Sequence, residues 1–126
     1  MSKPPANESG RENAEEPETH AALPDFAEAV LDVVAAIPAG RVMTYGDVAE
    51  YLGTRGPRAV GAVMSRFGSD VPWWRVLRAG GLPPQGHEAR ALQRYRREGT
   101  PLRPDGRRVD LRLARWGGSA SDGAAF

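Results

Sequence analysis

The chain of 126 residues contains no cysteine. Disulfides, thiolate metal sites and thiol nucleophiles are therefore excluded for any fold that the chain adopts. The chain also lacks an uninterrupted apolar run of about 18 residues, and its first residues are polar and acidic, so we expect neither a membrane span nor a secretory signal. These absences predict a cytoplasmic protein that does not associate with a membrane.

Acidic residues are scarce in the central part of the chain, although the net charge of the whole chain is only +1. Residues 41–115 hold fifteen arginines and seven carboxylates, whereas residues 1–24 hold two basic and five acidic groups. The central excess favours a polyanion such as the phosphate backbone of DNA, but a solvated arginine-rich surface explains it equally well. The only histidines, His20 and His87, lie far apart without carboxylate clusters, so we expect no metal and no cofactor.

Large apolar side chains are almost absent from residues 1–23, which predicts a disordered leader. Residues 117–126 are mostly glycine, alanine and serine, and predict a flexible tail. Between these ends, residues 24–116 form one predicted domain, which we expect to be monomeric. The 40% hydrophobic content of the chain suffices for a modest core.

Apolar residues between Phe26 and Ile37 recur at helical spacing and predict an amphipathic helix that starts at Pro24–Asp25. A second, short helix is predicted to follow Thr44, with Asp47 completing a capping box. The turn 54–57 then leads to a third helix, with Pro57 in its first turn. Two short helices joined by a tight turn indicate a helix-turn-helix.

The remaining segments show weaker patterns. We expect a short strand or turn at 73–77 and a fourth helix over 88–98, with Leu92 and Tyr95 toward the core. Alternating apolar residues in 106–113 predict a strand, after which Trp116 closes the core. The arginines of 90–97 and 107–115 are interpreted as solvated or as generic phosphate contacts.

Three ordered segments together resemble one family. Residues 37–49 read Ile-Pro-Ala-Gly-Arg-Val-Met-Thr-Tyr-Gly-Asp-Val-Ala, similar to a stretch in the DNA-binding domain of the O6-alkylguanine-DNA alkyltransferases. Residues 58–64 resemble the recognition helix of that family. Residues 72–76 read Pro-Trp-Trp-Arg-Val where active members have Pro-Cys-His-Arg-Val, and Glu98-Gly99 follow later. The resemblance covers residues 26–116 and implies a mainly α, winged-helix-like helix-turn-helix domain with short β segments.

In the active relatives the cysteine accepts the alkyl group, the histidine helps to activate it, and a glutamate orients that histidine. Here Trp73 and Trp74 stand at the first two positions, and Glu98 matches the third. An indole is a poor nucleophile beside a thiolate, so stoichiometric transfer to cysteine is excluded. The chain therefore resembles the alkyltransferase-like branch, although that branch usually keeps the histidine where Trp74 stands.

The resemblance also implies the DNA-binding residues. Arg58 matches the arginine that fills the gap left by an extruded nucleotide, and Tyr45 matches the tyrosine that crowds the neighbouring phosphate. The small residues Ala59, Gly61 and Ala62 are expected to let the helix approach the minor groove. The expected lesion pocket consists of Tyr45, Met64, Val71, Pro72, Trp73, Trp74 and Arg75. Trp74 fits a core role equally well, and for Arg75 we favour a buried ion pair over a DNA contact.

The function implied is a non-enzymatic DNA damage sensor. It would bind O6-alkylguanine in duplex DNA by nucleotide flipping and flag it for nucleotide-excision repair, as a protein associated with the nucleoid; the repair proteins come from the resemblance alone. A sequence-specific helix-turn-helix regulator is the alternative, and it would bind regardless of alkylation. A hydrolytic enzyme acting through Glu98 is a third class, which requires catalytic loss of the alkyl group.

Overall fold

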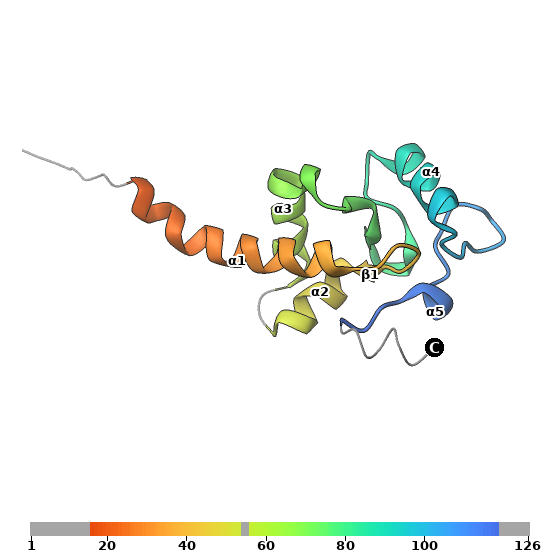
Figure 1. The fold of residues 1–126 in the computed structure, drawn as a ribbon, viewed down its shortest axis with the longest axis horizontal. Coiled ribbons are helices and arrows are strands. Elements are labelled where there is room, and N and C mark those ends of the chain that lie inside the picture. The colour runs from red at the N-terminus through yellow and green to blue at the C-terminus, as the bar shows by residue number, and fades with distance from the viewer. Residues whose placement is uncertain (1–15, 54–55, 119–126) are drawn as a thin grey trace, which may run out of the picture.

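The computed structural model describes residues 16–53 and 56–118, which form a mainly helical domain (Figure 1). Its helices and strands have the following bounds: α1 Glu16–Ala36, β1 Met43–Thr44, α2 Tyr45–Leu52, α3 Pro57–Phe67, β2 Val76–Leu77, α4 Glu88–Glu98 and α5 Leu111–Ala114. Three short 3₁₀ turns lie at Gly68–Asp70, Trp73–Arg75 and Ala79–Gly81. Within the described residues, no helix is long and apolar enough to cross a membrane.

Local capping chemistry sets the bounds of the short helices, as the sequence predicted. The Thr44 hydroxyl accepts a hydrogen bond from the Asp47 amide at 2.9 Å, and the Asp47 carboxylate accepts one from the Thr44 amide at 3.0 Å. Helix α2 ends at Gly53 and α4 ends at Gly99, both in the left-handed conformation with a φ of 72° that glycine adopts without steric cost. Pro57 occupies the first turn of α3.

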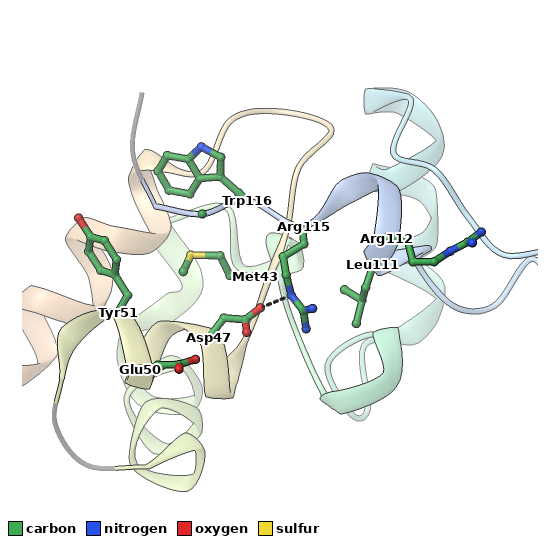
Figure 2. Close-up of a pocket in the computed structure, with 9 residues that line it drawn as sticks. Met43, Asp47, Glu50, Tyr51, Leu111, Arg112, Arg115 and Trp116 are labelled. Carbon is green, nitrogen blue, oxygen red and sulfur yellow. Dashed lines mark hydrogen bonds and ion pairs between the residues drawn. The ribbon is translucent and has the colours of Figure 1, made fainter. Parts of the chain in front are cut away.

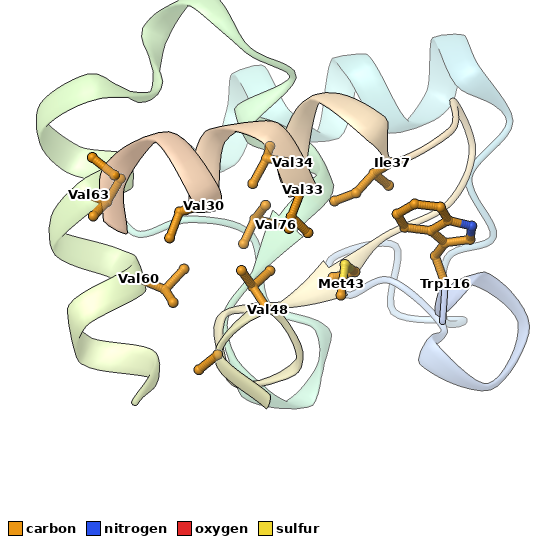
Figure 3. Packing of buried hydrophobic residues seen from close by; sticks show 12 residues of the cluster. Val30, Val33, Val34, Ile37, Met43, Val48, Val60, Val63, Val76 and Trp116 are labelled. Carbon is orange, nitrogen blue, oxygen red and sulfur yellow. The ribbon is translucent and has the colours of Figure 1, made fainter. Parts of the chain in front are cut away.

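Two hydrophobic clusters form the interior. The first joins one face of α1 to α2, α3 and Trp116 (Figure 3). The second packs α4 against Leu77, Val109 and Ala114. Strands β1 and β2 pair in parallel between the two clusters, with Met43 opposite Val76 and Thr44 opposite Leu77.

Side chains alternate along these strands. Met43 and Val76 therefore belong to the first cluster, while Val42 and Leu77 belong to the second. The short sheet thus holds both halves of the core in register. Trp116 is 5% exposed and completes the first cluster, as predicted.

The predicted start of the first helix was wrong. Helix α1 begins at Glu16 rather than at Pro24, so residues 16–23 of the predicted leader are helical. Residues 1–15 of that leader, and residues 119–126 of the predicted tail, lie outside the described residues.

The strand predicted over 106–113 is also absent from the described structure, where α5 follows an isolated bridge between Leu102 and Val109. The Asp110 carboxylate accepts a hydrogen bond from the Arg112 amide at 3.0 Å and caps α5. Local capping by aspartate therefore outweighs the alternating apolar pattern, and Leu113 is left 64% exposed.

Candidate nucleic-acid interface

Helices α2 and α3 form the predicted helix-turn-helix, and α3 presents a face of small side chains. Val60 and Val63 anchor α3 in the first cluster. On the rest of the helix Ala62 is exposed and Ala59 and Gly61 are half-buried. A Cβ atom added at Gly61 would meet no atom within 4 Å, so open space lies in front of this face. The arrangement permits the close approach to a groove that these residues predicted.

Arg58 lies in the first turn of α3 with its side chain exposed. Within the described residues, its guanidinium makes no hydrogen bond, ion pair or cation–π contact. It is therefore free to enter a base stack, which is the role that the resemblance implies.

Tyr45 begins α2 and packs partly against the first cluster. Burial raises the pKa of the Tyr45 hydroxyl above its ordinary value, although the positive charge of Arg78 acts in the opposite direction. The phenol therefore keeps its proton at neutral pH and remains a hydrogen-bond donor for an acceptor such as a phosphate oxygen.

Trp73 lies in the 3₁₀ turn Trp73–Arg75 and is half-buried. Three side chains surround its indole. The Trp74 ring meets it edge-on, with centroids 5.5 Å apart and an interplanar angle of 89°. The His87 ring is tilted at 5.6 Å, and the Arg90 guanidinium lies over the indole at 5.1 Å. These neighbours fix the orientation of Trp73 while part of its surface stays accessible.

Trp74 uses its indole differently. Its Nε1 donates a hydrogen bond to Glu98 Oε2 at 2.9 Å, and the Arg94 guanidinium lies over its ring at 4.3 Å. The carbonyl of Trp74 accepts a hydrogen bond from the Tyr95 hydroxyl at 2.6 Å. Trp74 therefore makes the contact with Glu98 that the resemblance implied for a histidine, and its ring packs on α4.

Glu98 is the centre of a cluster that also contains Trp74, Arg75 and the backbone amide of Gly40, here named the Glu98 cluster. Arg75 donates from Nε to Glu98 Oε1 at 3.0 Å and from Nη2 to Oε2 at 2.6 Å. A third donor, Arg75 Nη1, binds the Ile37 carbonyl at 2.8 Å, and the Gly40 amide reaches Glu98 Oε1 at 3.2 Å. Every nitrogen of the Arg75 guanidinium group is thus engaged within the protein, which confirms its predicted role as an ion-pair partner.

The Glu98 carboxylate is held in its charged form by these donors. Burial acts to raise the pKa of Glu98, but hydrogen bonds from Arg75, the Gly40 amide and Trp74 outweigh it and lower the pKa below the ordinary value. An anion that already accepts four hydrogen bonds is poorly placed to activate a water molecule. The geometry therefore gives no support to hydrolysis through Glu98.

The residues of the predicted lesion pocket are divided between the two clusters. Tyr45, Met64 and Val71 pack against the first cluster, and Trp73 and Trp74 pack against the second. Pro72 connects the two groups along the chain. Across it, the Trp73 amide donates a hydrogen bond to the Val71 carbonyl at 2.6 Å. Whether these residues enclose a single pocket therefore stays a prediction.

A cavity of about 510 Å³ lies elsewhere, between α2 and the segment that follows Asp110 (Figure 2). Asp47 and Arg115 form an ion pair at 2.9 Å in its wall. None of the predicted pocket residues lines this cavity. Sequence reasoning missed it because its two walls are more than 50 residues apart along the chain and share no motif.

Sequence reasoning also missed the contacts of Arg90, Arg94 and His87 with the two tryptophans. The spacing of Arg90 and Arg94, four residues apart on α4, was the available indication that they share a face. In the described part of the chain, no three His, Asp or Glu side chains gather as they would at a metal site.

Comparison with known proteins bears on the family and the fold of this chain. The family model for the DNA-binding domain of 6-O-methylguanine DNA methyltransferase matches residues 25–100. A protein of Escherichia coli K12 named DNA base-flipping protein is 42% identical over 99 residues, which cover 72% of this chain and 74% of that protein. Alkyltransferase-like protein 1 of Schizosaccharomyces pombe is 39% identical over 62 residues, covering 47% of this chain and 57% of that protein.

A solved structure shows the same fold. The crystal structure of S. pombe Atl1 in complex with damaged DNA containing O6-carboxymethylguanine matches with a TM-score of 0.63 and 31% sequence identity, covering 73% of this chain and 94% of Atl1. With its helix-turn-helix and its tryptophan at the cysteine position, this chain belongs to the family of the 6-O-methylguanine DNA methyltransferase DNA-binding domain, as an alkyltransferase-like member.

Proposed function

We propose that this protein binds O6-alkylguanine in duplex DNA by turning the damaged nucleotide out of the helix, and that it does not transfer the alkyl group. The observation that carries the proposal is the half-buried Trp73, fixed by three neighbouring side chains at the family's cysteine position. Atl1 in its complex with DNA containing O6-carboxymethylguanine supports the choice of ligand.

The chemistry of the site favours binding without transfer. An alkyl transfer needs a nucleophile whose lone pair attacks the alkyl carbon, and thiolate is the group that active relatives use. The chain has no cysteine, and the indole of Trp73 is a far weaker nucleophile at neutral pH. An aromatic ring at this position instead offers a surface on which an extruded base can stack.

The helix-turn-helix supplies the other half of the proposed mechanism. Extruding a nucleotide costs a few kcal/mol in lost stacking and pairing. Insertion of Arg58 into the vacated position and burial of the base beside Trp73 return a similar amount. Tyr45 next to the phosphate would favour the rotated conformation of the backbone.

We further propose that the complex presents the lesion to nucleotide-excision repair, which removes the damaged stretch of strand and so needs no alkyl transfer; this step rests on the family resemblance. A monomer associated with the nucleoid suffices for this role. The repair protein would recognise the bound complex rather than either component alone.

The test is an equilibrium titration of one duplex sequence containing guanine, O6-methylguanine or a bulkier O6-alkylguanine at its centre. Salt must be fixed, since non-specific affinity depends steeply on ionic strength. We expect tighter binding to both modified duplexes and an unchanged amount of O6-alkylguanine after long incubation. Equal dissociation constants for the three duplexes would refute the proposal, and affinity that follows base sequence instead would indicate a regulator.

A further inference from the structure

Helix α4 carries four exposed arginines, Arg90, Arg94, Arg96 and Arg97. The two carboxylates of the same helix are already paired, Glu88 with Arg78 and Glu98 with Arg75. Among residues 25–53 and 56–118, none of the four arginines has a carboxylate partner. Part of this uncompensated charge lies against the rings of the two tryptophans.

Only two of the four are held in place by aromatic contacts. The Arg90 guanidinium lies 5.1 Å from the centroid of Trp73, and its Nη2 is 2.8 Å from Nδ1 of His87. Arg94 lies 4.3 Å from the centroid of Trp74. The two arginines are four residues apart and therefore share one face of α4.

A guanidinium that stacks on an indole keeps its N–H donors available, because they point outward in the plane of the group. The stacking also restricts the side chain before any ligand arrives, so less conformational entropy is lost on binding. Guanidinium and phosphate match in charge and in hydrogen-bond geometry. A solvated arginine elsewhere on α4, such as Arg96, has the same charge without this preorganisation.

We propose that Arg90 and Arg94 bind the backbone phosphates that flank the extruded nucleotide. This inference rests on the proposed function, because a nucleotide turned out against Trp73 remains attached to the strand through its two phosphates. Those phosphates must then pass close to the side chains that surround Trp73. Helix α4 becomes a second contact with the damaged strand, separate from the helix-turn-helix.

The proposal is tested by salt-dependent titrations of the full chain with a short duplex that carries one O6-methylguanine. The variant is Arg90→Ala/Arg94→Ala, and the matched control is Arg96→Ala/Arg107→Ala. The control removes the same charge from exposed positions that have no aromatic contact in the described structure. Circular dichroism and thermal unfolding establish that each protein is folded.

Each lost phosphate contact reduces the slope of log Kd against log salt by about one. We expect the stacked pair to lose about two units of slope and roughly 10- to 100-fold in affinity at about 0.1 M salt. The control pair should change the slope by less than about half a unit. Should the double variant lose thermal stability, Arg90→Gln and Arg94→Gln are measured singly, each with an expected loss of about one unit.

Equal changes for the two pairs would overturn the proposal, because they would mean a general effect of net charge. An unchanged slope for the stacked pair would overturn it as well. The wild-type protein separates these outcomes from failure of the proposed function: if it does not prefer the O6-methylguanine duplex over the guanine duplex, the proposed function itself has failed.

Discussion

Replacing Glu98 by glutamine places a neutral amide in the middle of the Glu98 cluster. The side chain keeps its size, but one of its two acceptors becomes an NH₂ group that faces the donors of Arg75 and Trp74. The Arg75 and Glu98 side chains are 16% and 12% exposed, so the guanidinium left behind is poorly solvated. Removing one partner of a fully buried pair costs about 3–5 kcal/mol, whereas an exposed pair contributes about 0–1 kcal/mol.

With these exposed fractions, the Arg75–Glu98 pair resembles the buried case more than the exposed one. We therefore expect Glu98→Gln to lower the free energy of unfolding by about 2–4 kcal/mol, which corresponds to a fall in Tm of about 10–25 °C for a domain of this size. The assay is urea unfolding followed by tryptophan fluorescence at pH 7, together with a thermal scan. The matched control is Glu88→Gln on the same helix, whose ion pair with Arg78 is 3.3 Å long and exposed; its cost should stay below about 1 kcal/mol.

Wild type and Glu98→Gln can also be compared as a function of pH. Since the pKa of Glu98 is lowered in the folded state, its contribution is present above the ordinary value of 4.5 and is lost as the pH falls through the folded-state pKa. The difference in unfolding free energy between wild type and Glu98→Gln should therefore be constant near neutral pH and shrink below about pH 4.5. A Glu98→Gln protein as stable as Glu88→Gln, or a difference that grows in acid, would refute the reasoning.

Three further predictions concern DNA. Arg58→Ala should weaken binding to the O6-methylguanine duplex by roughly 1–3 kcal/mol while leaving Tm unchanged, and unchanged affinity in a folded variant would contradict its gap-filling role. Gly61→Leu should fold, because no atom lies within 4 Å of the new Cβ, but it should abolish binding to modified and unmodified duplexes alike in the same titration. Trp73→Cys should acquire no alkyl group from the duplex, because Trp74 replaces the activating histidine; a mass increase on the new thiol would show this expectation to be wrong.

The parts of the fold that local chemistry determines were predictable from sequence. The start of α2 is marked by Thr44 with Asp47, and the ends of α2 and α4 are marked by Gly53 and Gly99. These contacts lie within a few residues, and the observed helices begin and end where they predict. The segment after Gly106 was not predictable in this way. Its conformation depends on Asp110 as a helix cap and on hydrogen bonds from Val42 to Ala114 and from Trp116 to Val42, which span more than 70 residues.

In the candidate site, too, the local features were predictable from the sequence and the long-range contacts were not. The motif around Trp73 located the indole, because residues 72–76 are contiguous. The partners of the two indoles could not be predicted: Glu98 and Arg94 contact Trp74, and Arg90 contacts Trp73. All three come from α4, whose placement depends on packing in the second cluster. Periodicity shows which residues share a face of α4, but it does not show which neighbour that face meets.

Trp116 has a consequence for how the protein is made. The first cluster gathers residues from α1 to β2 and is completed by Trp116, whose amide donates a hydrogen bond to the carbonyl of Val42 at 2.8 Å. During synthesis, helices α1 to α3 leave the ribosome well before this indole does. The growing polypeptide therefore exposes the Ile37 and Met43 end of the first cluster until Trp116 is made, and we expect a product truncated before position 116 to be less stable than the full chain.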